Sequence, residues 1–147
     1  MVSTRKGQGE AKHLHHRLQE PLGTPRVHEA WLHVPKLRVA IEKMGAQRDL
    51  WFARTLSAAE VGLYDPAHSR WVERIGARVA LRVALRKLAP TIQGNLVEVR
   101  NDEWGRPTLH GALPPGEWLI SLSHDRERAA ALVVWLPPSA YEARERR

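Results

Sequence analysis

The chain has 147 residues, 43% of them hydrophobic, which suits one small folded domain and excludes wholesale disorder. It contains no cysteine, so disulfide scaffolds, thiolate zinc sites and cysteine nucleophiles are excluded. The formal net charge is +7, but residues 27–138 carry only +3 of it. This balance indicates an acidic partner without identifying nucleic acid.

The composition of the two terminal segments predicts that they are tails, which flank a folded domain of residues 27–138. Residues 1–26 predict a flexible basic tail, in which His13, His15 and His16 are solvated, and residues 139–147 predict a charged C-terminal tail. Residues 1–26 lack the apolar stretch of a secretory signal, and no apolar run approaches the roughly 20 residues that span a bilayer. We therefore expect a cytoplasmic protein.

The first half of the domain predicts one strand and three helices. Residues 27–34 predict a strand, and residues 35–44 predict a helix that Gly45 ends. Ser57 to Glu60 match the S-x-x-E capping box and begin a short helix that ends near Tyr64. Residues 66–88 predict the longest helix. Its expected apolar face consists of Val72, Ile75, Val79, Leu81, Val83, Leu85 and Leu88.

The second half of the domain predicts strands and turns. Residues 95–100 and 106–110 predict one hairpin, and residues 118–123 and 129–136 predict a second. Helices mostly precede strands, so the order predicts an α+β fold in which one long central helix packs on an antiparallel sheet.

An arginine recurs every four residues along the predicted long helix. The row consists of Arg70, Arg74, Arg78, Arg82 and Arg86. Each step turns about 400°, so the row forms a slanting stripe on the helix surface. Planar guanidinium groups suit phosphates or the carboxylates of an acidic helix. The alternative is a solvated face whose arginine stems cover apolar surface, and the spacing leaves both interpretations open.

The segment from Ser121 to Asp125 lies at the predicted turn of the second hairpin. His124 there is either a general base or phosphate ligand, or a structural residue of the turn. His124 and Asp125 are the acid/base candidates of the chain. Ser123, His124 and Asp125 are too close in sequence to be read as a catalytic triad, which is defined by spatial arrangement.

Three segments in order resemble the holo-acyl-carrier-protein synthases, a family of 4′-phosphopantetheinyl transferases. Residues 51–60 (WFARTLSAAE) resemble F-A-x-R-x-L-[ST]-x-x-E, and residues 74–85 (RIGARVALRVAL) resemble R-F-A-A-K-E-A-x-x-K-A-L. Residues 101–107 (NDEWGRP) with 121–124 (SLSH) resemble N-D-x-x-G-K-P and S-I-S-H. The resemblance spans residues 27–136. It implies a phosphopantetheinyl-transferase-like fold, a homotrimer with sites between subunits, and transfer of the phosphopantetheine arm of coenzyme A to a carrier-protein serine.

Carried over position by position, the resemblance implies a positively charged site. The implied residues that bind coenzyme A or its phosphopantetheine arm are Arg74, Arg78, Arg106, Ser123 and His124. The implied contacts to an acidic acyl carrier protein are Lys36, Arg54 and Arg70.

The family's magnesium ligands are not kept in this sequence. Ala30 and Val79 occupy the two carboxylate positions, and Val83 replaces the lysine one turn later. Magnesium requires oxygen ligands, so we expect no metal at these positions and no usual magnesium-dependent transfer. A relocated site that uses Asp102 or Asp125 stays open.

Three functions follow. The first is recognition of an acyl carrier protein or its phosphopantetheine-bound acyl chain, by a repurposed enzyme or an accessory factor of polyketide or fatty-acid-type biosynthesis. The second is a divergent but active phosphopantetheinyl transferase. The third is a nucleic-acid-binding domain, which the modest charge of residues 27–138 disfavours.

Overall fold

The computed structural model describes residues 24–138, so most of the two predicted tails, with His13, His15 and His16, lies outside the described residues. The strands are β1 (Arg26–His33), β2 (Val97–Asn101), β3 (Pro107–Gly111), β4 (Glu117–His124) and β5 (Arg128–Leu136). The α-helices are α2 (Val34–Lys43), α3 (Arg48–Thr55), α4 (Ala58–Val61) and α5 (Trp71–Leu88). Two short 3₁₀ helices are η1 (Gly45–Gln47) and η2 (Gly94–Leu96).

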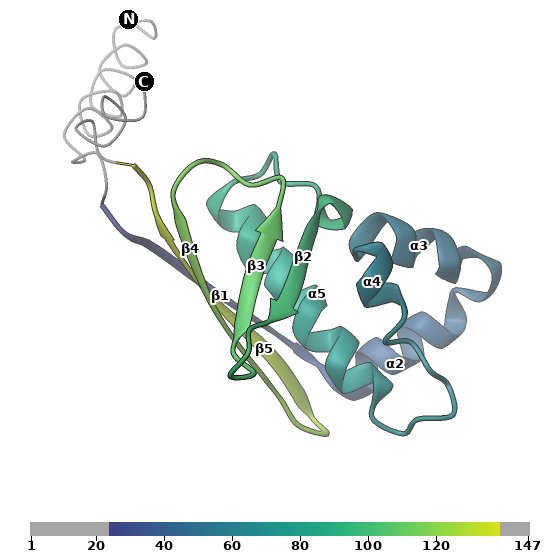
Figure 1. Ribbon diagram of the computed structural model, residues 1–147. Helices are drawn as coiled ribbons and strands as arrows, with labels where there is room; N and C mark the ends of the chain where they lie inside the picture. Colours follow the sequence, from purple (N-terminus) through teal and green to yellow (C-terminus); the bar gives the residue numbers. More distant parts are fainter. Residues whose placement is uncertain (1–23, 139–147) are drawn as a thin grey trace, which may run out of the picture.

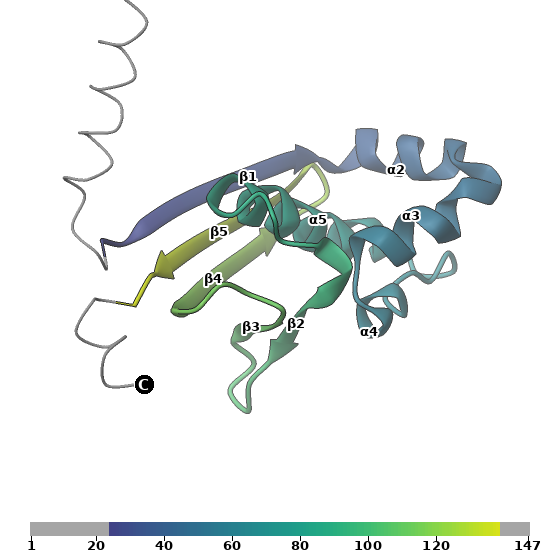
Figure 2. The same ribbon diagram turned by 90° about the horizontal axis from the view of Figure 1, so that it is seen from above.

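The predicted α+β architecture is confirmed. β1, β5 and β4 form an antiparallel sheet in that order, and β2 pairs with β3 in a separate hairpin. The long helix α5 packs on one face of the three-stranded sheet (Figure 1). Figure 2 shows α2, α3 and α4 gathered beside one end of α5. This arrangement brings the N-terminal end of α5 close to the β4–β5 turn.

Two clusters of buried side chains hold α5 in place. One joins its C-terminal half to the sheet and to β2, and the other joins its N-terminal half to α2 and α3. Of the predicted apolar face, Val72, Ile75, Leu81, Leu85 and Leu88 are buried. Val79 is half-buried and packs against the core, whereas Val83 is 44% exposed, so the prediction is wrong for Val83. Each step of four residues advances about 40° around the helix, which carries this row out of the core.

The structure shifts two predicted boundaries. α5 begins at Trp71 rather than near residue 66, because Asp65 Oδ1 accepts a hydrogen bond from Ala67 N (3.0 Å) and closes a turn. α4 ends at Val61 rather than near Tyr64. α3 was not predicted as a helix, and it buries Phe52 against the N-terminal half of α5.

Two glycines have distinct roles in this fold, one in ending a helix and one in close packing. Gly45 has φ 55°, a left-handed conformation that ends the α2 segment as predicted. Gly76 lies where α5 crosses the sheet, and a Cβ there would be 3.0 Å from the Cβ of Ala129. A larger residue at position 76 would push the helix away from β5.

None of the helices in residues 24–138 is long and apolar enough to cross a membrane.

Candidate functional site

The arginine row of α5 does not form one uniform surface. Arg74 and Arg86 are exposed, whereas the Arg82 side chain is only 5% exposed and lies in the interior. The interpretation of the whole row as a single binding stripe is therefore wrong. The drift of the row around the helix, about 40° per step, carries Arg82 beneath η2 and β2 while Arg74 stays in solvent.

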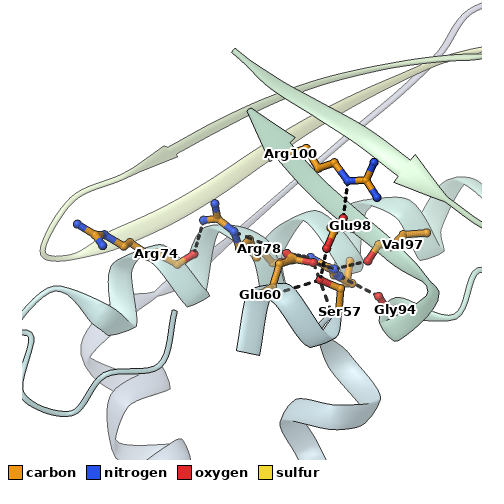
Figure 3. Close-up of polar contacts among 9 residues, drawn as sticks. Ser57, Glu60, Arg74, Arg78, Gly94, Val97, Glu98 and Arg100 are labelled. Atoms are coloured by element: carbon orange, nitrogen blue, oxygen red, sulfur yellow. Dashed lines mark hydrogen bonds and ion pairs between the residues drawn. The ribbon is translucent and has the colours of Figure 1, made fainter. Parts of the chain in front are cut away.

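Arg82 forms a buried ion pair with Glu60. The Glu60 side chain is 3% exposed, and both of its carboxylate oxygens accept hydrogen bonds from the Arg82 guanidinium, one of them at 2.7 Å from Nη1. Arg82 also donates to the carbonyls of Gly94 (3.2 Å) and Val97 (2.8 Å). Figure 3 shows Glu60 beside Ser57, which completes the predicted capping box of α4. Arg82 thus joins α4, α5, η2 and β2.

Arg78 belongs to the same network. Its Nε lies 3.6 Å from Glu60 Oε2, and its Nη1 donates to the Arg74 carbonyl at 3.1 Å (Figure 3). Burial, with neighbouring Arg82, lowers the pKa of the Arg78 guanidinium against the opposing effect of Glu60. The resemblance implied that Arg78 binds coenzyme A. In the structure its guanidinium contacts Glu60 and the Arg74 carbonyl instead of being free in solvent.

A second buried carboxylate lies at the N-terminal end of α5. The Glu73 side chain is 4% exposed, with Oε2 3.1 Å from Arg70 Nε and Oε1 3.6 Å from His124 Nδ1. Oε1 has no hydrogen-bond partner among the described residues. The structure therefore brings together two of the predicted site residues, Arg70 and His124, around an acid that sequence reasoning had not selected.

A pocket of about 480 Å³ opens beside this acid. Its lining consists of Arg38, Ser69, Arg70, Glu73 and Arg126. Arg38 is fixed by a hydrogen bond to the Ser69 carbonyl (3.0 Å) and lies over the Trp71 ring. The lining thus holds three arginines and one glutamate, and the N-terminal end of α5 adds a partial positive charge. Such a pocket attracts anionic groups.

Asp125 holds the β4–β5 turn. Its Oδ1 accepts hydrogen bonds from the backbone N–H groups of Glu127 (2.7 Å) and Arg128 (2.8 Å). These two bonds, the one from Arg128 first, lower the pKa of the Asp125 carboxyl. An acid held ionised in this way does not suit proton donation, so the geometry favours His124 over Asp125 as the acid/base group.

The other predicted site residues lie apart from this pocket. Ser123 faces the opposite side of the sheet from His124, where it lines a shallow pocket with Ser121 and Trp31. Arg106 lies at the exposed β2–β3 turn, 3.2 Å from Asp102 Oδ2. Lys36 in the first turn of α2 and Arg54 in the last turn of α3 are exposed.

The donor set does not suit a magnesium ion at the family's positions. Ala30 is buried in the sheet, Val79 is half-buried and Val83 is exposed, and none of them offers an oxygen from its side chain. Asp102 accepts from the backbone of Trp104 and Arg106, which lowers its carboxyl pKa and ties it to the β2–β3 turn. Residues 24–138 contain no group of three or more His, Asp or Glu that could hold a metal.

The comparisons with known proteins identify the family. No family model matches the chain. It is 40% identical over 86 residues to the holo-[acyl-carrier-protein] synthase of Nocardia farcinica, a match that covers 50% of this chain and 59% of that protein. It is 33% identical over 110 residues to the synthase of Solidesulfovibrio magneticus, covering 67% of this chain and 87% of that protein. The chain belongs to the holo-[acyl-carrier-protein] synthase family.

Solved structures agree with this assignment at the level of the fold. The synthase of Bacillus anthracis in complex with CoA (3′,5′-ADP) superposes with a TM-score of 0.62 and 22% identity, covering 76% of this chain and 96% of that one. The synthase of Neisseria meningitidis gives a TM-score of 0.60 and 18% identity, covering 74% and 95%. The predicted phosphopantetheinyl-transferase-like fold is confirmed.

Two buried acids, Glu60 and Glu73, were not selected from sequence as pairing partners. Glu60 and Arg82 are far apart in the chain, and only the capping box marked Glu60 as special. Glu73 carried a usable signal, because it is the one acidic residue in an α5 segment that contains five basic residues. An isolated acid among arginines indicates a specific pairing rather than a solvated face.

Proposed function

We propose that this protein recognises an acyl carrier protein and the phosphopantetheine arm of coenzyme A, in polyketide or fatty-acid-type biosynthesis, without the magnesium chemistry of its family. The observation that carries this proposal is the basic pocket at the N-terminal end of α5, which Arg38, Arg70 and Arg126 line together with Glu73, the neighbour of His124. Guanidinium groups bind the phosphates of such an arm and the carboxylates of an acidic carrier protein. Membership of the holo-[acyl-carrier-protein] synthase family supports an acyl carrier protein as the partner.

Coenzyme A is the ligand that the related structures suggest, since the Bacillus anthracis and Helicobacter pylori synthases are described in complex with it. In this chain Arg74 and Arg106 are the exposed predicted ligands, and His124 is partly exposed beside the pocket. Arg78 takes a lesser part because Glu60 already holds it. No step of the proposal passes through a metal.

Arg74→Glu is expected to weaken binding of an acidic carrier protein by about tenfold, because it turns an attractive charge into a repulsive one at the proposed interface. Arg86→Glu is the matched control, since Arg86 is also exposed on α5 but lies three turns away. Isothermal titration calorimetry of both variants measures the difference. Equal binding by the two variants would mean that the N-terminal end of α5 does not contact the carrier protein.

Incubation with coenzyme A, magnesium and an apo carrier protein is expected to leave the carrier serine unmodified, as read by intact-mass spectrometry. A family member with both carboxylates serves as the positive control. Val79→Glu alone should not restore transfer, because Ala30 and Val83 still lack functional groups. Conversion by the wild-type protein at an ordinary enzymatic rate would establish the divergent active transferase instead.

The proposal includes a homotrimer that assembles through the sheet face opposite α5. That face exposes Val27 (55%), Trp31 (61%), Leu119 (49%) and Leu132 (39%) from all three strands. Arg128 lies over the Trp31 ring at 4.6 Å and marks one edge of this apolar sheet face. Apolar patches that run across a whole sheet commonly mark protein–protein interfaces.

A further inference from the structure

Two glutamates of this protein are equally buried, and their hydrogen bonding differs. Glu60 and Glu73 are each 3% exposed as residues. Both oxygens of Glu60 accept hydrogen bonds from Arg82, so the Glu60 carboxylate has no unpaired oxygen. Glu73 uses Oε2 for Arg70, but its buried Oε1 has no hydrogen bond within the described residues. A buried carboxylate oxygen left without a donor is costly, and such groups are commonly kept for function.

The imidazole of His124 lies close to that oxygen. Nδ1 of His124 lies 3.6 Å from Glu73 Oε1, so a small rotation of either side chain closes a hydrogen bond. The bond that one ring nitrogen makes decides which nitrogen carries the proton. With Nδ1–H directed to Glu73, the Nε2 atom presents a lone pair on the other edge of a ring whose side chain is 36% exposed.

We infer that Glu73 is a positioning residue that fixes His124 as a proton acceptor, through Nε2, for a hydroxyl or thiol group of the bound carrier-protein substrate. The inference rests on the proposed function and names the chemistry of the same site. Glu73 stands one residue before the segment that resembles the family helix. A carboxylate behind an imidazole is the general arrangement that orients a base and stabilises its protonated form.

The proposed step transfers one proton between the substrate and Nε2 of His124. The proton of the substrate O–H or S–H passes to Nε2, and the bonding electron pair stays on the oxygen or sulfur. The resulting imidazolium keeps its Nδ1–H directed to Glu73. The proton returns when the substrate atom is protonated again. The charged groups around the pair are Arg70 at the N-cap of α5, Arg38 on α2, and Asp125 and Arg126 in the β4–β5 turn.

The test reads the imidazole directly, in the full-length protein. Nitrogen-15 NMR of the ring at pH 8 is expected to show the Nδ1–H tautomer for His124 in the wild type and in Glu73→Gln, whose amide oxygen still accepts the bond. Glu73→Leu should lose that tautomer. Carbethoxylation of His124 by diethyl pyrocarbonate, mapped by mass spectrometry, should slow severalfold in Glu73→Gln, because the neutral amide keeps the shape but no longer stabilises the positive charge that develops on the ring.

Controls separate positioning from folding and from binding. His28, exposed on β1, is the internal reference for reagent access, and Glu117→Gln on the far end of β4 is the matched variant. Thermal unfolding shows that each variant is folded. An unchanged His124 tautomer in folded Glu73→Leu, or an unchanged modification rate in Glu73→Gln, would overturn the inference. Failure of the wild type to bind carrier protein would overturn the proposed function instead and leave the tautomer result standing.

Discussion

Glu60→Ala is expected to lower the free energy of unfolding by about 3–5 kcal/mol, because it leaves the Arg82 guanidinium buried without its counter-charge. Arg82 is only 5% exposed at its side chain and cannot reach water without moving η2 and β2. The loss of the α4 capping box adds to the effect, since the Glu60 carboxylate also accepts a hydrogen bond from Ser57 N. Urea unfolding followed by circular dichroism measures the change.

Two comparison variants separate this explanation from a general effect of losing charge. Arg100→Ala removes an exposed ion pair to Glu98 on neighbouring β2 and should leave the urea midpoint close to wild type. The double variant Glu60→Leu with Arg82→Met removes both charges together and should recover much of the lost stability. A Glu60→Ala protein as stable as Arg100→Ala would show that Arg82 finds solvent or another partner.

Local signals predicted most of the fold, because they depend on residues that are close in the chain. The capping box at Ser57 to Glu60, the two hairpins and the left-handed Gly45 each follow from a few neighbouring residues. α3 lacked such a signal, since it has no side-chain N-cap bond and only Phe52 is buried along its eight residues. Spacing of Phe52 and Leu56 by four residues was the one usable clue.

The candidate site was predicted less well, because it depends on contacts between distant segments. The sequence indicated His124 and the arginines separately, but Glu73 and His124 are 51 positions apart and meet only through the packing of α5 on β4. The spacing of the arginine row gave no sign that Arg82 turns inward while Arg74 stays exposed. That difference arises from η2 and β2, which cover only one side of α5.

The proposed trimer is expected to dissociate when a charge is placed in the centre of the apolar sheet face. Leu132 lies on the middle strand β5, opposite Glu29 on β1 and Ser121 on β4. Leu132→Lys would put an ammonium group beside Glu29 in each subunit contact, and the cost of removing both charges from water can exceed the attraction between them. Light scattering at micromolar concentration should therefore give three times the chain mass for the wild type and the chain mass for Leu132→Lys.

Leu50→Lys is the matched control for this experiment. Leu50 is 47% exposed on α3, on the far side of α5 from the sheet, whereas Leu132 is 39% exposed. The same substitution at the two positions therefore differs mainly in whether it lies on the proposed interface, and Leu50→Lys should keep the wild-type mass. A wild-type protein with the mass of a single chain would contradict the proposed trimer. A Leu132→Lys protein with three times the chain mass would show that the subunits contact each other through another face. Because the proposed interface lies opposite α5, it leaves the basic pocket and the Glu73–His124 pair accessible.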